Sequence, residues 1–240
     1  MTAPELRDLS GMAEFRAAEA LQREVWGDGD LPDPADLMMV IQAEGGLVAG
    51  AFAGGRLIGY VFGFPTRDPR VQHSHRLAVR AEARGQGLGL RLKLHQRRWC
   101  LAHGISHVRW TFDPLRATNA ALNIHRLGAE AGTYLEDYYG EMEGINRGLP
   151  SDRLLADWHL DGPTATAIAG GRPRPATGGE QPMTPALPED FAALLAEDPE
   201  AAADLRLNLR QALQQAFAAG CRVVDFDRQA RRYILRPARG

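Results

Sequence analysis

The sequence is poor in cysteine, with only Cys100 and Cys221 among its 240 residues. Two thiols so far apart cannot form the disulfide framework that holds a small secreted scaffold together. Neither cysteine has neighbouring residues in a metal-ligand pattern, so a cysteine-based zinc site is not expected either. We therefore expect two ordinary thiols and a protein that works without a metal ion.

Long apolar runs and an excess of charge of one sign are also missing. No apolar run approaches the ~20 residues that a membrane-spanning helix needs. The formal net charge is −2, from 28 basic and 30 acidic residues that are interspersed, so the basic surface of a nucleic-acid-binding protein is not expected. The first eight residues are too polar for the apolar segment of a secretory signal. We expect a cytoplasmic protein with no membrane or nucleic-acid partner.

What the sequence does contain is a glycine-rich stretch over 73–89, which reads His-Ser-His-Arg-Leu-Ala-Val-Arg-Ala-Glu-Ala-Arg-Gly-Gln-Gly-Leu-Gly. The pattern predicts a strand over 73–79, a polar turn, and a loop before a helix that begins near Leu88. Glycine has no Cβ, so backbone N–H groups in such a loop can approach a ligand closely. The N-terminus of the next helix favours an anion, and Arg84 adds a positive charge. The stretch therefore indicates a phosphate or pyrophosphate site.

Spacing distinguishes this loop from other phosphate loops. A P-loop needs a lysine after its last glycine, and a dinucleotide fingerprint follows the first strand of a βαβ unit; neither condition holds here. The motif Arg-Gly-Gln-Gly-Leu-Gly after a strand ending Leu-Ala-Val resembles the acetyl-CoA loop of the GNAT superfamily of acyl-CoA N-acyltransferases. The resemblance implies acetyl-CoA as co-substrate and a loop that binds its pyrophosphate through Arg84, Gly85, Gln86, Gly87, Leu88 and Gly89.

The same resemblance gives the preceding strand a role. The backbone of Leu77, Ala78 and Val79 would pair with the pantetheine arm in the manner of an added strand. A backbone N–H near Ala78 or Val79 would then polarise the thioester carbonyl.

Two histidines on this strand suggest the proton chemistry. His73 and His75 are two residues apart, so their rings share one face of a strand. The segment His-Ser-His-Arg-Leu-Ala-Val resembles the His-x-His-x-Leu-Ala-Val strand of the serotonin N-acetyltransferase family, whose paired histidines relay the proton of the amine. An alkylammonium with a pKa near ~10 must lose a proton before it can attack a thioester. We predict that His75 takes this proton, with His73 behind it or through water; the alternative is a pair of half-buried histidines bonded to carbonyls.

The sequence departs from the family at the general acid. Many GNAT enzymes place a tyrosine four residues before the glycine that ends the next helix, and here Ile124 stands four residues before Gly128. Either water or another side chain must protonate the thiolate, the candidates being His125, Tyr134, Tyr138 and Tyr139. The resemblance also makes Asn119 and Asn123 candidates for bonding the pantetheine amides, with helix capping as the alternative.

A wider resemblance covers most of residues 10–160. The segment Trp-Thr-Phe-Asp-Pro-Leu at 110–115 and the polar, aromatic segment at 133–154 resemble an uncharacterised branch of predicted GNAT acetyltransferases. That branch brings no established substrate. Because an acceptor would lie where such a loop follows the sheet, Asp113, Glu141 and Arg153 are candidates for binding a charged acceptor, or else solvated loop charges.

Periodicity along the chain predicts a mixed α/β fold with the order β-α-α-β-β-β-α-β-α-β-β, which the GNAT fold requires. Asp33 is expected to cap a helix over 34–43. We assign residues 1–162 to an acetyltransferase domain, 163–185 to a linker, and 186–240 to a helix-helix-hairpin extension. The extension repeats the element order near the N-terminus, so we expect a partial GNAT-like half that docks on the first domain or on a second subunit of a homodimer.

Together these patterns predict an acetyl-CoA-dependent N-acetyltransferase that transfers the acetyl group directly to the amine of a small molecule or peptide. Two alternatives stay open. One is a non-catalytic acyl-CoA-binding or sensor module of the same fold, and the other is a nucleotide-binding protein.

Overall fold

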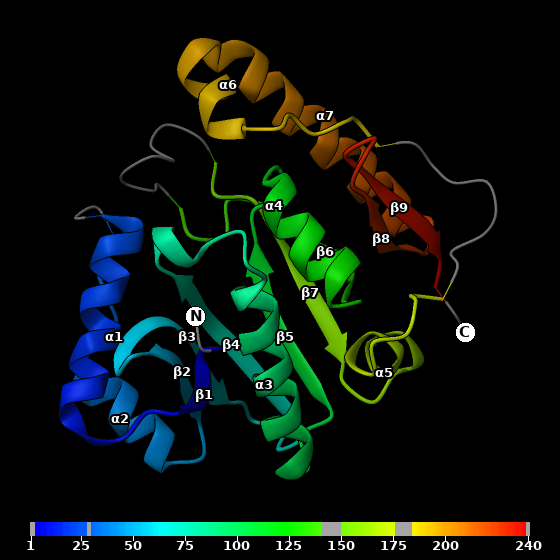
Figure 1. Ribbon diagram of the computed structural model, residues 1–240. Coiled ribbons are helices and arrows are strands. Elements are labelled where there is room, and N and C mark those ends of the chain that lie inside the picture. Colours follow the sequence, from blue (N-terminus) through cyan, green and yellow to red (C-terminus); the bar gives the residue numbers. More distant parts are fainter. Residues whose placement is uncertain (1–2, 28–29, 141–149, 176–183, 239–240) are drawn as a thin grey trace. The chain divides into compact units, whose positions relative to one another are not determined.

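The computed structural model describes residues 3–27, 30–140, 150–175 and 184–238, which form a mixed α/β structure as predicted (Figure 1). The chain divides into two compact units, Met1–Arg109 and Trp110–Gly240. In the described residues, no helix is long and apolar enough to cross a membrane.

The first unit is a mixed sheet with helices on both of its faces. Its elements are β1 (Glu5–Asp8), α1 (Gly11–Trp26), α2 (Ala35–Ala43), β2 (Leu47–Ala53), β3 (Arg56–Pro65), β4 (Val71–Val79), a 3₁₀ turn (Ala81–Ala83), α3 (Leu88–Ala102) and the first half of β5 (His107–Phe112). Strands β1 to β4 are antiparallel neighbours, and β4 then pairs in parallel with β5.

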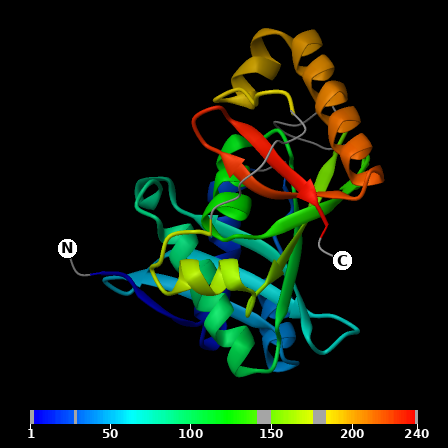
Figure 2. The ribbon, with the colours of Figure 1, turned by 90° about the vertical axis from the view of Figure 1, so that its right-hand side faces the viewer.

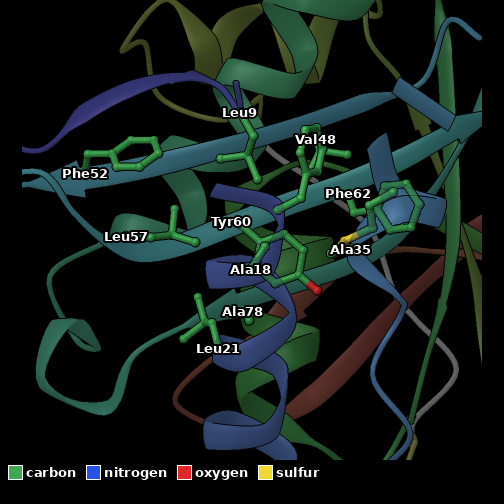
Figure 3. Packing of buried hydrophobic residues seen from close by; sticks show 12 residues of the cluster. Leu9, Ala18, Leu21, Ala35, Val48, Phe52, Leu57, Tyr60, Phe62 and Ala78 are labelled. Atoms are coloured by element: carbon green, nitrogen blue, oxygen red, sulfur yellow. The ribbon is translucent and has the colours of Figure 1, made fainter. Parts of the chain in front are cut away.

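Two apolar clusters explain why the central strands are apolar on both sides. Val48 and Tyr60 face α1 and α2 in one cluster, which Figure 3 shows from close by. Ala49 and Val61, their neighbours along the strands, belong to the other cluster with Leu92 of α3. Because side chains alternate across a strand, each face of β2 and β3 is covered by a different set of helices.

Strand β4 has two irregular features that set up the site. Its register against β3 shifts between the pairs Phe62↔Arg76 and Gly63↔Ser74, so His75 is an extra residue in a β-bulge. Its parallel pairing with β5 covers only 71–73 against 107–109. Beyond His73, β4 therefore pairs with β3 alone among the described strands of this unit.

The second unit contains the rest of β5 and the C-terminal elements. These are α4 (Ala117–Ala120), a π-helical turn (Ala121–Arg126), β6 (Glu130–Leu135), β7 (Arg153–His159), α5 (Pro163–Ala169), α6 (Phe191–Glu197), α7 (Pro199–Ala218), β8 (Cys221–Asp227) and β9 (Arg232–Pro237). Strand β6 is antiparallel to both β7 and β8, and β9 completes a hairpin with β8. Helix α7 packs against β6 and β8, as Figure 2 shows from the side.

Two sequence predictions need correction. Residues 163–169, predicted as part of a linker, form helix α5, with Pro163 at its first turn and Ala165 and Ala167 buried. The helix predicted after β5 continues as a π-helical turn from Ala121. The C-terminal hairpin of β8 and β9 pairs with β6 of the second unit. The structure divides the chain after Arg109, and the domain boundary that we placed after residue 162 stays a prediction.

Candidate functional site

The glycine-rich loop presents a run of unused backbone donors. Gly85 and Gly87 have φ angles of 76° and 74°, in the left-handed region that favours glycine. The N–H of Arg84 bonds to Ala81 O and that of Arg91 to Gly87 O, but the six N–H groups of 85–90 have no backbone acceptor among the described residues. Residues 84–86 are exposed. These amides at the start of α3 form an arrangement that fits a phosphate or pyrophosphate group.

Side chains around the loop leave it open to a ligand. Arg84 Nε donates to Val79 O over 3.1 Å, and Gln86 Nε2 donates to Glu82 O over 3.2 Å. The Arg84 side chain makes no other hydrogen bond to the described residues, so its terminal nitrogens remain available to an anion. Beneath the loop, Leu88 is buried. On β3, a Cβ at Gly59 would lie 3.0 Å from Ala78 O and 3.2 Å from Leu92 Cδ1, so the glycine lets β4 and α3 approach β3 closely.

Strand β4 offers an unpaired edge next to this loop. The N–H of Arg80 donates to Ile58 O of β3 over 2.9 Å. Backbone groups alternate along a strand, so those of Ala78 also face β3, whereas those of Leu77 and Val79 face away from it. Of the two predicted donors to a thioester carbonyl, Val79 thus has its N–H on the open edge and Ala78 does not.

The two histidines share one face of β4. Their ring centroids are 6.1 Å apart, and both rings contact Phe64 of β3. His73 stacks on Phe64 at 4.9 Å, and burial, aided by the charges of His75 and Arg109, lowers its pKa to about 4. His73 is therefore neutral at physiological pH. His75, in the bulge, keeps 35% of its side chain exposed and is the one accessible to a substrate.

A cavity of about 290 Å³ lies beside Phe64. It is lined by Ile41 and Glu44 from the end of α2 and by Phe64 and Pro65 from the end of β3. Phe64 thus forms a wall of the cavity and also contacts both histidines. Glu44 is the charged residue among the four.

An acidic segment between α1 and α2 contacts the histidine strand. Asp33 Oδ1 lies 3.1 Å from His75 Nε2, and Arg76 pairs with both Asp30 and Asp33. The sequence predicted Asp33 as a helix cap, but Pro34 occupies that position and no side-chain cap bond forms there. This contact joins residues 42 positions apart, so no local pattern could reveal it.

The remaining predicted site residues lie in the second unit. Asp113 is buried, its Oδ2 accepts from Arg206 Nη2 at 3.3 Å, and its Oδ1 accepts from the Leu115 N–H. Both oxygens have partners within the unit, and the contact with an acceptor stays a prediction. Arg153 is partly buried over the ring of Tyr139, and Glu141 lies outside the described residues.

The candidates for the general acid and for the pantetheine amides also fall in this unit. Tyr134 donates to Asp152 Oδ2 over 2.7 Å, and burial raises its pKa well above the usual range, so it is a poor proton donor. His125 Nδ1 bonds to Asp225, whereas Tyr138 and Tyr139 are exposed. Asn119 lies on α4 and Asn123 in the π-helical turn, with no side-chain hydrogen bond to the described residues.

Comparison with solved structures gives the same fold at low sequence identity. The ribosomal-protein-S18-alanine N-acetyltransferase from Escherichia coli is 18% identical, with a TM-score of 0.52 over 65% of this chain and 94% of that one. The phosphinothricin acetyltransferase from Sinorhizobium meliloti, solved in complex with AcCoA, is 20% identical, with a TM-score of 0.53 over 65% and 88%. An N-acetyltransferase from Staphylococcus aureus Mu50 is 14% identical, with a TM-score of 0.56 over 67% and 100%.

No curated protein sequence matches the chain. The profile of the acetyltransferase (GNAT) family, however, matches residues 12–129, a range that includes α1, the histidine strand and the glycine-rich loop. Residues 12–129 of this chain thus form a domain of the GNAT acetyltransferase family.

Proposed function

We propose that the chain is an acetyl-CoA-dependent N-acetyltransferase that transfers the acetyl group directly to the amine of a small molecule or peptide. One observation carries this proposal: the six unpartnered N–H groups of 85–90 adjoin the open edge of β4, the strand that also bears His75. Acetyl-CoA joins a diphosphate to a thioester through an extended arm. Val79 lies four positions after His75 on the strand, about 13 Å away, so an elongated ligand suits this arrangement.

Each group has a distinct role in the proposed reaction. The amides of 85–90 and Arg84 bind the pyrophosphate, and the outward-facing backbone of Leu77 and Val79 orients the pantetheine arm. The Leu77 N–H, which also faces the open edge and lies two residues from His75, donates to the thioester carbonyl. His75 removes the proton from the acceptor ammonium, so the amine can attack while both substrates are bound.

Ile124 supports a second candidate function. A hydrophobic side chain at the position where many GNAT enzymes have a tyrosine cannot protonate a leaving thiolate, as expected of an acyl-CoA-binding or sensor module. The exposed His75 and its contact with Asp33 favour the enzyme, because a module that only binds acyl-CoA needs no base.

Two measurements on the full chain test the proposal. Calorimetry with acetyl-CoA, with ATP and NAD as controls, should show binding of acetyl-CoA alone. A panel of primary amines, followed by release of free thiol, should then show turnover with at least one amine. Binding without turnover of any amine would favour the sensor module, and no binding at millimolar acetyl-CoA would exclude both.

The variant His75→Ala separates catalysis from binding. We expect turnover to fall about 10²–10⁴-fold, the usual effect of removing a general base, with an unchanged Kd for acetyl-CoA. An equal loss of turnover and of acetyl-CoA affinity would instead show that His75 has a structural role.

A further inference from the structure

We propose that Asp33 is a positioning residue that holds His75 in the tautomer protonated at Nε2, so that Nδ1 is the atom that takes the proton of the acceptor amine. This inference rests on the proposed function and adds to it a named atom and a partner from a different part of the chain.

The contact itself determines the tautomer. Asp33 Oδ1 lies 3.1 Å from His75 Nε2, within hydrogen-bond distance. An ionised carboxylate can only accept hydrogen bonds, so Nε2 must carry the hydrogen and Nδ1 must carry the lone pair. Burial tends to raise the pKa of Asp33, but its bond with His75 and the charges of His75 and Arg76 outweigh that effect and keep the pKa low. Asp33 is therefore ionised at neutral pH.

Asp33 is held in place by contacts that do not involve His75. The side chain of Gln22, only 1% exposed on α1, accepts from the Asp33 N–H at 2.8 Å and donates to the Asp33 carbonyl at 3.4 Å. Glu19 accepts a hydrogen bond from the N–H of Ala35 at 3.0 Å. Glu19 therefore caps the start of α2, the role that the sequence predicted for Asp33. The Asp33 carboxylate is therefore not used for capping and can accept a hydrogen bond from His75.

Charged and titratable groups from three elements surround this pair. Arg76 and His73 come from β4, and the Arg76 guanidinium lies 3.0 Å from Asp33 Oδ2 and also pairs with Asp30. Tyr60 of β3 has a buried hydroxyl whose pKa is raised by burial and by Asp33. Phe62 and Phe64 supply the uncharged wall. His73 is neutral, and Arg76 is paired with Asp30 and Asp33. Asp33 is the carboxylate that contacts the His75 ring directly.

The proton transfer is then defined atom by atom. The N–H bond of the acceptor ammonium breaks and a bond from His75 Nδ1 to that proton forms. The amine keeps the electron pair with which it attacks the thioester carbonyl. The C–S bond then breaks to release the CoA thiolate, and the second proton of the attacking nitrogen passes through water to that thiolate. The resulting imidazolium retains its Nε2–H bond to Asp33, whose charge stabilises it, and Asp33 itself does not take up the proton. The proton leaves later from Nδ1 to water.

Asp33→Asn is the direct test, and Asp30→Asn is its matched control. Asparagine at 33 can donate from its amide to Nε2, which favours the opposite tautomer and puts the hydrogen on Nδ1. We expect kcat to fall about 10²-fold, with acetyl-CoA Kd unchanged. Asp30→Asn removes a neighbouring charge whose partner among the described residues is Arg76, and should stay within about twofold of the unaltered protein.

A second measurement reads the tautomer without relying on activity. Long-range ¹⁵N–¹H correlation spectra of the full chain at pH 8 distinguish protonated Nε2 from protonated Nδ1, and the His75 signals are identified by their loss in His75→Gln. We expect protonation at Nε2 in the unaltered chain and a shift toward Nδ1 in Asp33→Asn.

The possible outcomes have distinct meanings. Protonation at Nδ1 in the unaltered chain, or equal losses of kcat in the two Asp variants, overturns the assignment of Asp33. A loss of acetyl-CoA binding in Asp33→Asn indicates a structural role and overturns it as well. If no amine is turned over although Nε2 carries the hydrogen, the proposed function fails while the contact between Asp33 and His75 stands.

Discussion

Lys93 Nζ donates a hydrogen bond to Ser74 Oγ over 2.9 Å, on the opposite face of β4 from His73 and His75. The lysine is only 2% exposed and also donates to Gln96 Oε1 at 2.8 Å. Gln96 in turn donates to Gln72 Oε1 at 2.7 Å. This polar network ties α3, which begins at the glycine-rich loop, to the strand that carries the histidines. A displacement of one element would therefore disturb the other.

The first prediction concerns how the free energy of unfolding depends on pH. Burial lowers the pKa of Lys93 to about 7, against about 10.4 in an unfolded chain. Between these values the unfolded chain binds a proton that the folded chain does not, so the free energy of unfolding should rise with pH, by about 1.4 kcal/mol per unit. Lys93→Met should lack this rise. Urea denaturation at intervals from pH 7 to 8.5 measures both slopes.

The upper limit of that range is set by Cys100. Burial raises its pKa to about 12, whereas a thiol in the unfolded chain titrates near ~8.5, so above that pH its effect on stability has the opposite sign. If the free energy of unfolding changed equally with pH in the unaltered chain and in Lys93→Met below pH 8.5, Lys93 would be charged in its buried site.

The second prediction concerns the charge at the loop. Arg84 is exposed, and its guanidinium donates only to Val79 O among the described residues, so it can turn toward a bound diphosphate. Arg84→Gln should weaken acetyl-CoA binding about 3–10-fold at low salt. Because salt screens exposed charges, the loss should shrink in 0.5 M NaCl. Calorimetry at both salt concentrations measures this difference.

Arg56→Gln is the control for that experiment. Arg56 is also exposed and pairs with Glu82 at 2.9 Å, but it lies in the β2–β3 hairpin and not in the loop. The variant Arg56→Gln should bind acetyl-CoA as the unaltered chain does. A loss with Arg84→Gln that is the same at both salt concentrations would show that the arginine shapes the loop and does not contact an anion.

Local patterns in the sequence were enough to predict most elements and the glycine-rich loop. Helix α1 follows its apolar stripe, and the loop has positive φ angles at Gly85 and Gly87, where a residue without a Cβ is needed. These features depend on neighbouring residues. Helix α5 was missed because seven residues rich in alanine and threonine carry no apolar period, and burial of Ala165 and Ala167 against other elements stabilises it.

Contacts between distant residues could not be predicted in this way. Asp33 has the sequence context of a helix cap, and only the folded chain brings His75 next to it. Asp113 has the context of an accessible loop carboxylate, yet its partner Arg206 comes from α7, 93 residues away. For a charged side chain, the identity of the partner decides between binding a substrate and stabilising the fold. That partner is a property of the tertiary structure.

The last prediction uses this buried pair in the second unit. The Arg206 side chain is 4% exposed, and its Nε and Nη1 have no hydrogen-bond partner among the described residues, so Asp113 is its main counter-charge. Removing one member of a buried ion pair leaves the other uncompensated, at a cost of about 3–5 kcal/mol. Asp113→Ala should therefore strongly destabilise the unit. Arg206→Met should cost less, because Asp113 keeps its bond from the Leu115 N–H and the nearby charge of Arg153.

Hydrogen exchange of α7 and β7 amides, measured in the full chain, reports the stability of this unit without assuming that the two units unfold together. Exchange in both elements should be faster in Asp113→Ala than in Arg206→Met, and slowest in the unaltered chain. The reverse order would mean that the Asp113 carboxylate, and not the Arg206 guanidinium, is the more costly group to leave unpaired.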